Sequence, residues 1–300
     1  MKHKTNYWSA AAAFFCTVTV LLSLLPSAVF ADYPSQEEGE EIVEEVPSNE
    51  GKLIIGNADG SAGENEGKRI VLSTAEDFQA FSLNCRNNVW SIGLTVYLDA
   101  DIDFEGRSIM PVPSFSGTFL GNGHTIKNFY CGSNGSHQGL FRYLEEGGRI
   151  ADLNVMGTIT PGGSQSSIGG IIGTSRGTIL NCTFSGTVNG LNSVGGIVGE
   201  NLGIISDCES SGSISGKHFA GGIAGYNDGT IRECTNKAEV NIEVRDEAID
   251  IETLDIRDII GINLVSSEDK DTVSDIGGIA GISLGLVDSC TNEGTVGYQH

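Results

Sequence analysis

The 300-residue chain contains little proline, few tryptophans and few methionines, and its basic residues are far outnumbered by acidic ones. It has 6 Pro, 2 Trp and 3 Met, and 17 Lys and Arg against 39 Asp and Glu, which gives a formal net charge of −22. Such an excess of negative charge repels nucleic acid and anionic membranes, and it suits solubility, divalent cations or a basic partner. We therefore expect no nucleic-acid partner.

The short motifs of common hydrolases are also missing. The sequence has no H-E-x-x-H zinc motif and no G-x-S-x-G nucleophile turn, and its histidines beyond residue 31 lack a Cys or His partner at zinc-binding spacing. Acids at equivalent repeat positions, such as Asp207 and Glu233, are interpreted as a solvated turn face and not as a catalytic pair. We expect no catalytic residue, no resident metal and no cofactor, and we predict that the chain is not an enzyme.

Beyond residue 31 no apolar run is long enough to cross a bilayer. Residues 1–31 have the form of a secretory signal peptide: Lys2 and Lys4 begin it, an apolar run follows as far as Pro26, and small residues precede a cleavage point after Ala31. An uncleaved membrane anchor is the alternative, which the short run disfavours. The expected location is secreted or at the cell surface.

Glycine, in contrast, is abundant, with 42 residues, and it recurs in a repeated pattern. Four copies begin with an apolar residue followed by Gly-Gly-Ile, and each later carries a Cys three places after an apolar residue. The shared positions are Ile171, Ile197, Ile223 and Ile279, and then Cys182, Cys208, Cys234 and Cys290. The first two intervals between these cysteines are equal, and the last is longer because it also holds an insert at 241–270. A fixed period within the range of about 20 to 50 residues indicates stacked repeats.

Each copy contains too much glycine for a helix, and its short apolar clusters predict three short strands joined by corners. Stacked about 4.8 Å apart, the copies would form a parallel β-helix, or β-solenoid, of about five rungs, an all-β fold. The shared isoleucines would make one inward ladder. A second ladder would contain Val188, Ile214, Val240 and Val296. A weaker copy over residues 138–159 has Leu153 at the Cys position, which indicates that this position needs an apolar filler.

Residues 221–236, GGIAGYNDGTIRECTN, resemble the GLUG motif of bacterial secreted and surface proteins, and residues 115–128 resemble the segment that leads into such repeats. The resemblance covers about residues 68–300. The same motif occurs beside the catalytic domain of immunoglobulin A peptidases. The resemblance therefore implies a non-catalytic exported scaffold, for adhesion or for interaction with a host protein or glycan. The alternative is the N-terminal non-catalytic region of a larger secreted peptidase or polysaccharide-degrading enzyme.

We expect four regions along the chain. They are a signal peptide at 1–31, an acidic disordered linker at 32–67, an N-terminal cap with entry strands at 68–137, and the GLUG-type solenoid at 138–300 with its insert at 241–270. The cap is predicted to contain a short helix that begins with a capping box of Ser73 and Glu76 and presents Phe78, Phe81 and Cys85 on one apolar face. The helix would cover the open edge of the first rung.

Residues 95–104 are predicted to form one strand, in which Asp99, Asp101 and Asp103 alternate with apolar residues. We interpret these carboxylates as solvent-facing or turn-capping. A calcium site is the alternative interpretation, although no Gly directly follows Asp103.

Six cysteines remain after the signal peptide, an even number that suits disulfides in an exported chain. The four repeat cysteines would point the same way, so we expect a ladder of buried thiols. Cys85 and Cys131 could pair or stay free. The insert is a surface loop or a contact surface for another chain. The last rung has no predicted cap, so we expect that the natural product continues.

Overall fold

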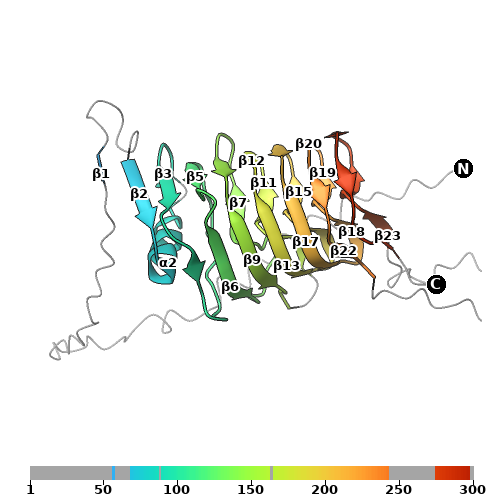
Figure 1. Ribbon diagram of the computed structural model, residues 1–300, viewed down its shortest axis with the longest axis horizontal. Helices are drawn as coiled ribbons and strands as arrows, with labels where there is room; N and C mark the ends of the chain where they lie inside the picture. The colour runs from blue at the N-terminus through green and yellow to red at the C-terminus, as the bar shows by residue number, and fades with distance from the viewer. Residues whose placement is uncertain (1–55, 58–67, 88, 163–164, 243–273, 298–300) are drawn as a thin grey trace, which may run out of the picture. The chain divides into compact units, whose positions relative to one another are not determined.

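Strands far apart in the sequence lie side by side in the computed structural model, which describes residues 56–57, 68–87, 89–162, 165–242 and 274–297 (Figure 1). Within these ranges the strands wind into a parallel β-solenoid of about six turns, with one short helix near its N-terminal end. The predicted fold class is confirmed. The predicted signal peptide and most of the linker and the insert lie outside the described residues.

The strands belong to four sheets that run along the solenoid. The nine-stranded sheet contains β1 (Gly56–Asn57), β2 (Lys68–Leu72), β3 (Thr95–Leu98), β5 (Thr118–Leu120), β8 (Arg149–Ala151), β12 (Thr178–Leu180), β16 (Ile204–Ser206), β20 (Thr230–Arg232) and β25 (Leu286–Asp288). The eight-stranded sheet contains β4 (Ile102–Asp103), β6 (Thr125–Cys131), β9 (Asn154–Ile159), β13 (Thr183–Asn189), β17 (Glu209–Ser215), β21 (Thr235–Asn236), β22 (Glu239–Val240) and β26 (Thr291–Asn292). The five-stranded sheet contains β7 (Phe141–Leu144), β11 (Ile172–Ser175), β15 (Val198–Asn201), β19 (Ala224–Asn227) and β24 (Ala280–Ser283). The four-stranded sheet contains β10 (Ser166–Gly169), β14 (Asn192–Gly195), β18 (His218–Gly221) and β23 (Ser274–Gly277).

One full coil has four short strands, for example β14 to β17, so the expectation of three was wrong. The first glycine of each Gly-Gly pair ends a strand, as Gly195 ends β14. Gly196 and Ile197 then form the corner before β15, so Ile197 lies at this corner instead of within a strand. A Cβ on Gly196 would collide with the carbonyl oxygen of Gly222 in the next coil. The second glycine of the pair therefore lets neighbouring coils approach closely.

The register follows the sequence period. Ile179 stands opposite Ile205, which stands opposite Ile231, so each residue faces its equivalent in the next copy. The next partner in this row is Val287, which follows the insert in the sequence. The coil after the insert thus returns to the same register as the coils before it.

The first coil is covered by the helix α2 (Ala75–Asn84), whose buried Phe78 and Phe81 pack against rings from the entry coils. The predicted capping box is displaced by one residue. Thr74 Oγ1 accepts a hydrogen bond from the Asp77 backbone N–H at 3.1 Å, and Asp77 Oδ2 accepts one from the Thr74 N–H at 3.0 Å. The displacement puts Asp77 at the third helical position, where its carboxylate reaches back to the cap.

The N-terminal region contains strands ahead of the first Gly-Gly-Ile copy. Gly56–Asn57, within the expected linker, pair antiparallel with β2. The entry strands join the same sheets as the repeats, since β3 pairs with β5 and β5 with β8. The solenoid therefore begins well before the first Gly-Gly-Ile copy.

Candidate functional site

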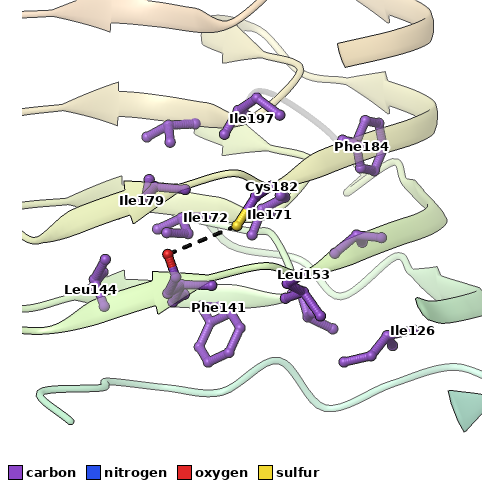
Figure 2. Close-up of a cluster of buried hydrophobic side chains, with 14 of the residues drawn as sticks. Ile126, Phe141, Leu144, Leu153, Ile171, Ile172, Ile179, Cys182, Phe184 and Ile197 are labelled. Carbon is purple, nitrogen blue, oxygen red and sulfur yellow. Dashed lines mark hydrogen bonds between the residues drawn. The ribbon is translucent and has the colours of Figure 1, made fainter. Parts of the chain in front are cut away.

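The repeat cysteines lie at a corner of the core. Cys182, Cys208 and Cys234 are almost wholly buried, Cys290 is partly exposed, and all of the described cysteines, Cys85 and Cys131 included, are free thiols. Figure 2 shows the Cys182 sulfur among Ile171, Ile179 and Leu153, with its thiol directed at the carbonyl oxygen of Ile150 at 3.8 Å.

Burial raises the pKa of two of these thiols. It raises the pKa of Cys85 to about 12, and it raises the pKa of Cys208 well above its ordinary value. A thiol with a raised pKa forms little thiolate, which is the nucleophile and the metal ligand. Cys208 is therefore suited to filling space, whereas a hydrogen bond with Cys208 lowers the pKa of Cys234.

The shared isoleucines are buried as well. Ile171, Ile197 and Ile223 have no exposed surface, and Ile279, in the last described coil, is partly buried. In the second predicted ladder, Val188 pairs with Ile214, Ile214 with Val240, and Val240 with Val296. Positions that repeat in the sequence thus supply the interior of the solenoid.

The three alternating aspartates do not converge. The strand predicted over residues 95–104 is broken into β3 and β4 at residues 99–101, and the carboxylates of Asp101 and Asp103 have different backbone partners. Asp101 Oδ1 accepts from the Thr125 N–H at 2.9 Å, and Asp103 Oδ1 accepts from the Glu105 N–H at 2.8 Å. These bonds lower the pKa of both carboxyl groups.

The structure gives no support to a calcium site here. Among the described residues no group of three or more His, Cys, Asp or Glu side chains is placed to hold a metal ion. Among the residues that the structure describes, no helix has the length and apolar character needed to cross a bilayer.

Asp207 and Glu233 occupy the corner just before a repeat cysteine. Both have left-handed backbone, with φ of 54°. Their shared position is thus a turn of the backbone, which Asn181, at φ 50°, also occupies one coil earlier.

Two rows of polar side chains, which the sequence did not reveal, run between coils; Asn201, Asn227 and Asn236 are buried and Asn292 is exposed. In one, Asn201 Nδ2 donates to Asn227 Oδ1 at 2.7 Å; in the other, Asn236 Nδ2 donates to Asn292 Oδ1 at 2.7 Å. Recurrence of Asn at the same position of successive copies was the signal that could have revealed them. Each amide satisfies the next, so these polar groups can be buried without loss of hydrogen bonding.

A groove near the N-terminal coils gathers basic side chains. Two adjoining hollows, of about 380 and 440 Å³, share Arg86, Pro113 and Arg142 in their walls. Tyr143 and Arg176 line the first hollow, together with Ser114 and Glu145. We call these two hollows the arginine groove. The repeat pattern does not reveal this groove, because its residues lie at positions that do not repeat.

Arg142 is fixed at the centre of the arginine groove. Its Nε donates to the His137 carbonyl oxygen at 3.3 Å, and its Nη2 donates to the Ser136 carbonyl oxygen at 3.2 Å. The guanidinium carbon lies 5.9 Å from the centre of the Tyr143 ring, and the His137 ring packs on the same tyrosine at 5.0 Å. The arginine and the tyrosine are therefore held as a pair.

Comparison with known proteins agrees with the repeat pattern. Residues 164–189 and 190–215 match the family model described as the GLUG motif, so the chain contains GLUG repeats. A stretch of 78 residues, 26% of the chain, is 42% identical to part of halomucin from Haloquadratum walsbyi (strain DSM 16790 / HBSQ001), and it spans 1% of that protein. The crystal structure of a "putative immunoglobulin A1 protease" from Bacteroides ovatus is similar over 58% of this chain and 67% of that chain, with 22% identity and a TM-score of 0.43.

Proposed function

We propose that the chain is a non-catalytic, exported β-solenoid scaffold, secreted or at the cell surface, that presents outward side chains to a host protein or a glycan in adhesion. One observation carries the proposal: inward positions repeat from coil to coil, whereas outward positions do not. In one row of the five-stranded sheet, partly exposed except at the buried Thr174, the successive residues are Tyr143, Thr174, Glu200, Tyr226 and Ile282.

This division suits a binding scaffold. Repeated packing gives a stiff support, and the variable exterior gives each coil its own surface chemistry. The match to a small part of a much longer protein supports the idea that such repeats serve as modules within larger chains. The burial and raised pKa values of Cys85 and Cys208 support a packing role for these two thiols.

Two measurements test the proposal together. The full chain, expressed with its N-terminal segment in a bacterial host, should appear outside the cytoplasm, with Ala31 as the last residue removed. The purified protein should retain a defined ligand on combined glycan and protein arrays and leave it chemically unchanged. Retention in the cytoplasm, or turnover of the retained ligand, would contradict the proposal.

A further inference from the structure

The charge of the arginine groove is opposite to that of the chain. Arg86, Arg142 and Arg176 line it, and Glu145 is the acid among its lining residues. Glu145 Oε1 accepts a hydrogen bond from Ser114 Oγ at 2.8 Å. The groove therefore has an excess of positive charge within a chain of net charge −22.

These arginines lack the acidic partners that Arg107 and Lys237 have. Arg107 pairs with Glu76 at 3.0 Å and Lys237 with Glu209 at 2.7 Å, but no ion pair among the described residues includes Arg86, Arg142 or Arg176. Arg86 Nη2 contacts the Met110 sulfur at 3.4 Å. Neutral partners leave the guanidinium charge uncompensated and available to an anion.

The remaining walls suit a sugar. Tyr143 is half-buried, with an apolar ring and a polar hydroxyl, and it stands beside the fixed guanidinium of Arg142. Ser133, Asn134 and Gln138 line the second hollow and carry hydroxyl and amide groups that can bond to sugar hydroxyls. Each hollow has the volume of a small-molecule site. Their shared wall makes them a continuous place for two or more sugar units.

We infer that the arginine groove binds a short carboxylated oligosaccharide, with a uronate-type carboxylate on the arginines and a sugar ring against Tyr143. Guanidinium groups bind carboxylates with two parallel hydrogen bonds, which gives both strength and orientation. The negative charge of the rest of the chain disfavours a long polyanion such as nucleic acid, which would extend beyond the groove. The inference rests on the proposed function, because it specifies the ligand class of the scaffold.

The test compares two probes that differ in their carboxyl groups, which are ionised in one and methyl-esterified in the other. Isothermal titration calorimetry of the full chain should show saturable binding of a tri- or tetragalacturonate, and at least ten-fold weaker binding of its methyl-esterified form. Binding of the acid form should weaken as salt is raised. Equal binding of both probes, or no binding of the acid form, would overturn the inference.

Substitutions locate the site. The double variant R86Q/R176Q changes two exposed side chains and should weaken galacturonate binding at least ten-fold. Adding Tyr143→Ala to this double variant should weaken the binding further. Arg149→Gln, an exposed arginine outside the groove, is the control for charge and should bind as the parent does. Unchanged binding by R86Q/R176Q would overturn the assignment of the site.

Further outcomes separate this inference from the proposed function. Inorganic sulfate or phosphate that competes with galacturonate at equal concentration would show a general anion site and overturn the saccharide assignment. An array ligand that binds R86Q/R176Q as well as the parent would also overturn it, while the scaffold function stands. Shortening of galacturonate by the protein would instead contradict the non-catalytic function.

Discussion

Asn201 Nδ2 donates a hydrogen bond to Asn227 Oδ1 in the next coil at 2.7 Å, and both side chains are wholly buried. Asn227 continues the row by donating to Ser283 Oγ at 2.9 Å. At the other end, Ser175 stands in register with Asn201, and its buried Oγ has no hydrogen-bond partner. The row of amides therefore ends at Asn201. An amide at position 175, in the preceding coil, could extend it.

Ser175→Asn should stabilise the protein. The new amide would donate to Asn201 Oδ1 as Asn201 donates to Asn227, which adds about 1 kcal/mol to the free energy of unfolding. Denaturant unfolding measures the change, with Ser185→Asn on an outward position of β13 as the control. A destabilised Ser175→Asn protein would mean that the site lacks room for the amide.

Ile223→Asp should strongly destabilise the solenoid. Ile223 has no exposed surface, so the variant loses about 1.5–3 kcal/mol of side-chain burial, and a buried unpaired charge adds to the cost. Thermal unfolding should show a much lower Tm. Tyr226→Asp, at an outward position of the neighbouring strand β19, should change the Tm little, and equal effects of the two substitutions would contradict the inward assignment.

Thr74→Ala and Ser73→Ala should have different effects on stability. Thr74 Oγ1 accepts the Asp77 N–H, so its loss should cost about 1 kcal/mol of unfolding free energy. Ser73 takes part in the cap through its backbone N–H, which donates to Asp77 Oδ2 and survives the substitution to alanine. Chemical denaturation of both variants checks this, and a larger loss in Ser73→Ala would restore the cap predicted from the sequence.

Glu233→Asn should raise stability by about 0.5–1 kcal/mol. Glu233 has φ of 54°, and asparagine tolerates the left-handed conformation better than glutamate does. Asn181 already occupies the equivalent corner at φ 50°. The midpoint of urea unfolding is the measurement, and Glu239→Asn in β22, where φ is not left-handed, should give no such gain.

Alkaline pH should destabilise the protein in part through Cys85. Burial raises the folded pKa of this thiol from 9.0 to about 12, so above pH 9 the unfolded chain loses a proton that the folded chain keeps. The stabilisation is complete below pH 9 and is lost toward pH 12, by about 1.4 kcal/mol per pH unit. The free energy of unfolding of Cys85→Ala should therefore fall less steeply between pH 8.5 and 10.5 than that of the parent. Parallel slopes would contradict the raised pKa.

The sequence predicted the architecture because packing positions must repeat when coils stack. Ile197, Cys208 and Ile214 stand out through their equivalents in other coils, and the structure buries them all. The corner at Gly196 and Ile197 could not be located from the sequence, because glycine content alone does not say whether the chain bends or extends. The arginine groove could not be predicted, since Arg86, Arg142 and Arg176 come together only through the stacking of different coils.

The register across the insert has a practical consequence. His218 pairs with Ser274 just as Asn192 pairs with His218, although the insert lies between the first two residues in the sequence and no insert lies between the second two. The stack thus tolerates extra sequence at the junction between β22 and β23 while the next coil docks in its usual place. This junction is a suitable position for grafting a foreign peptide or a reporter domain, because the flanking coils keep their register across the insert that is already there.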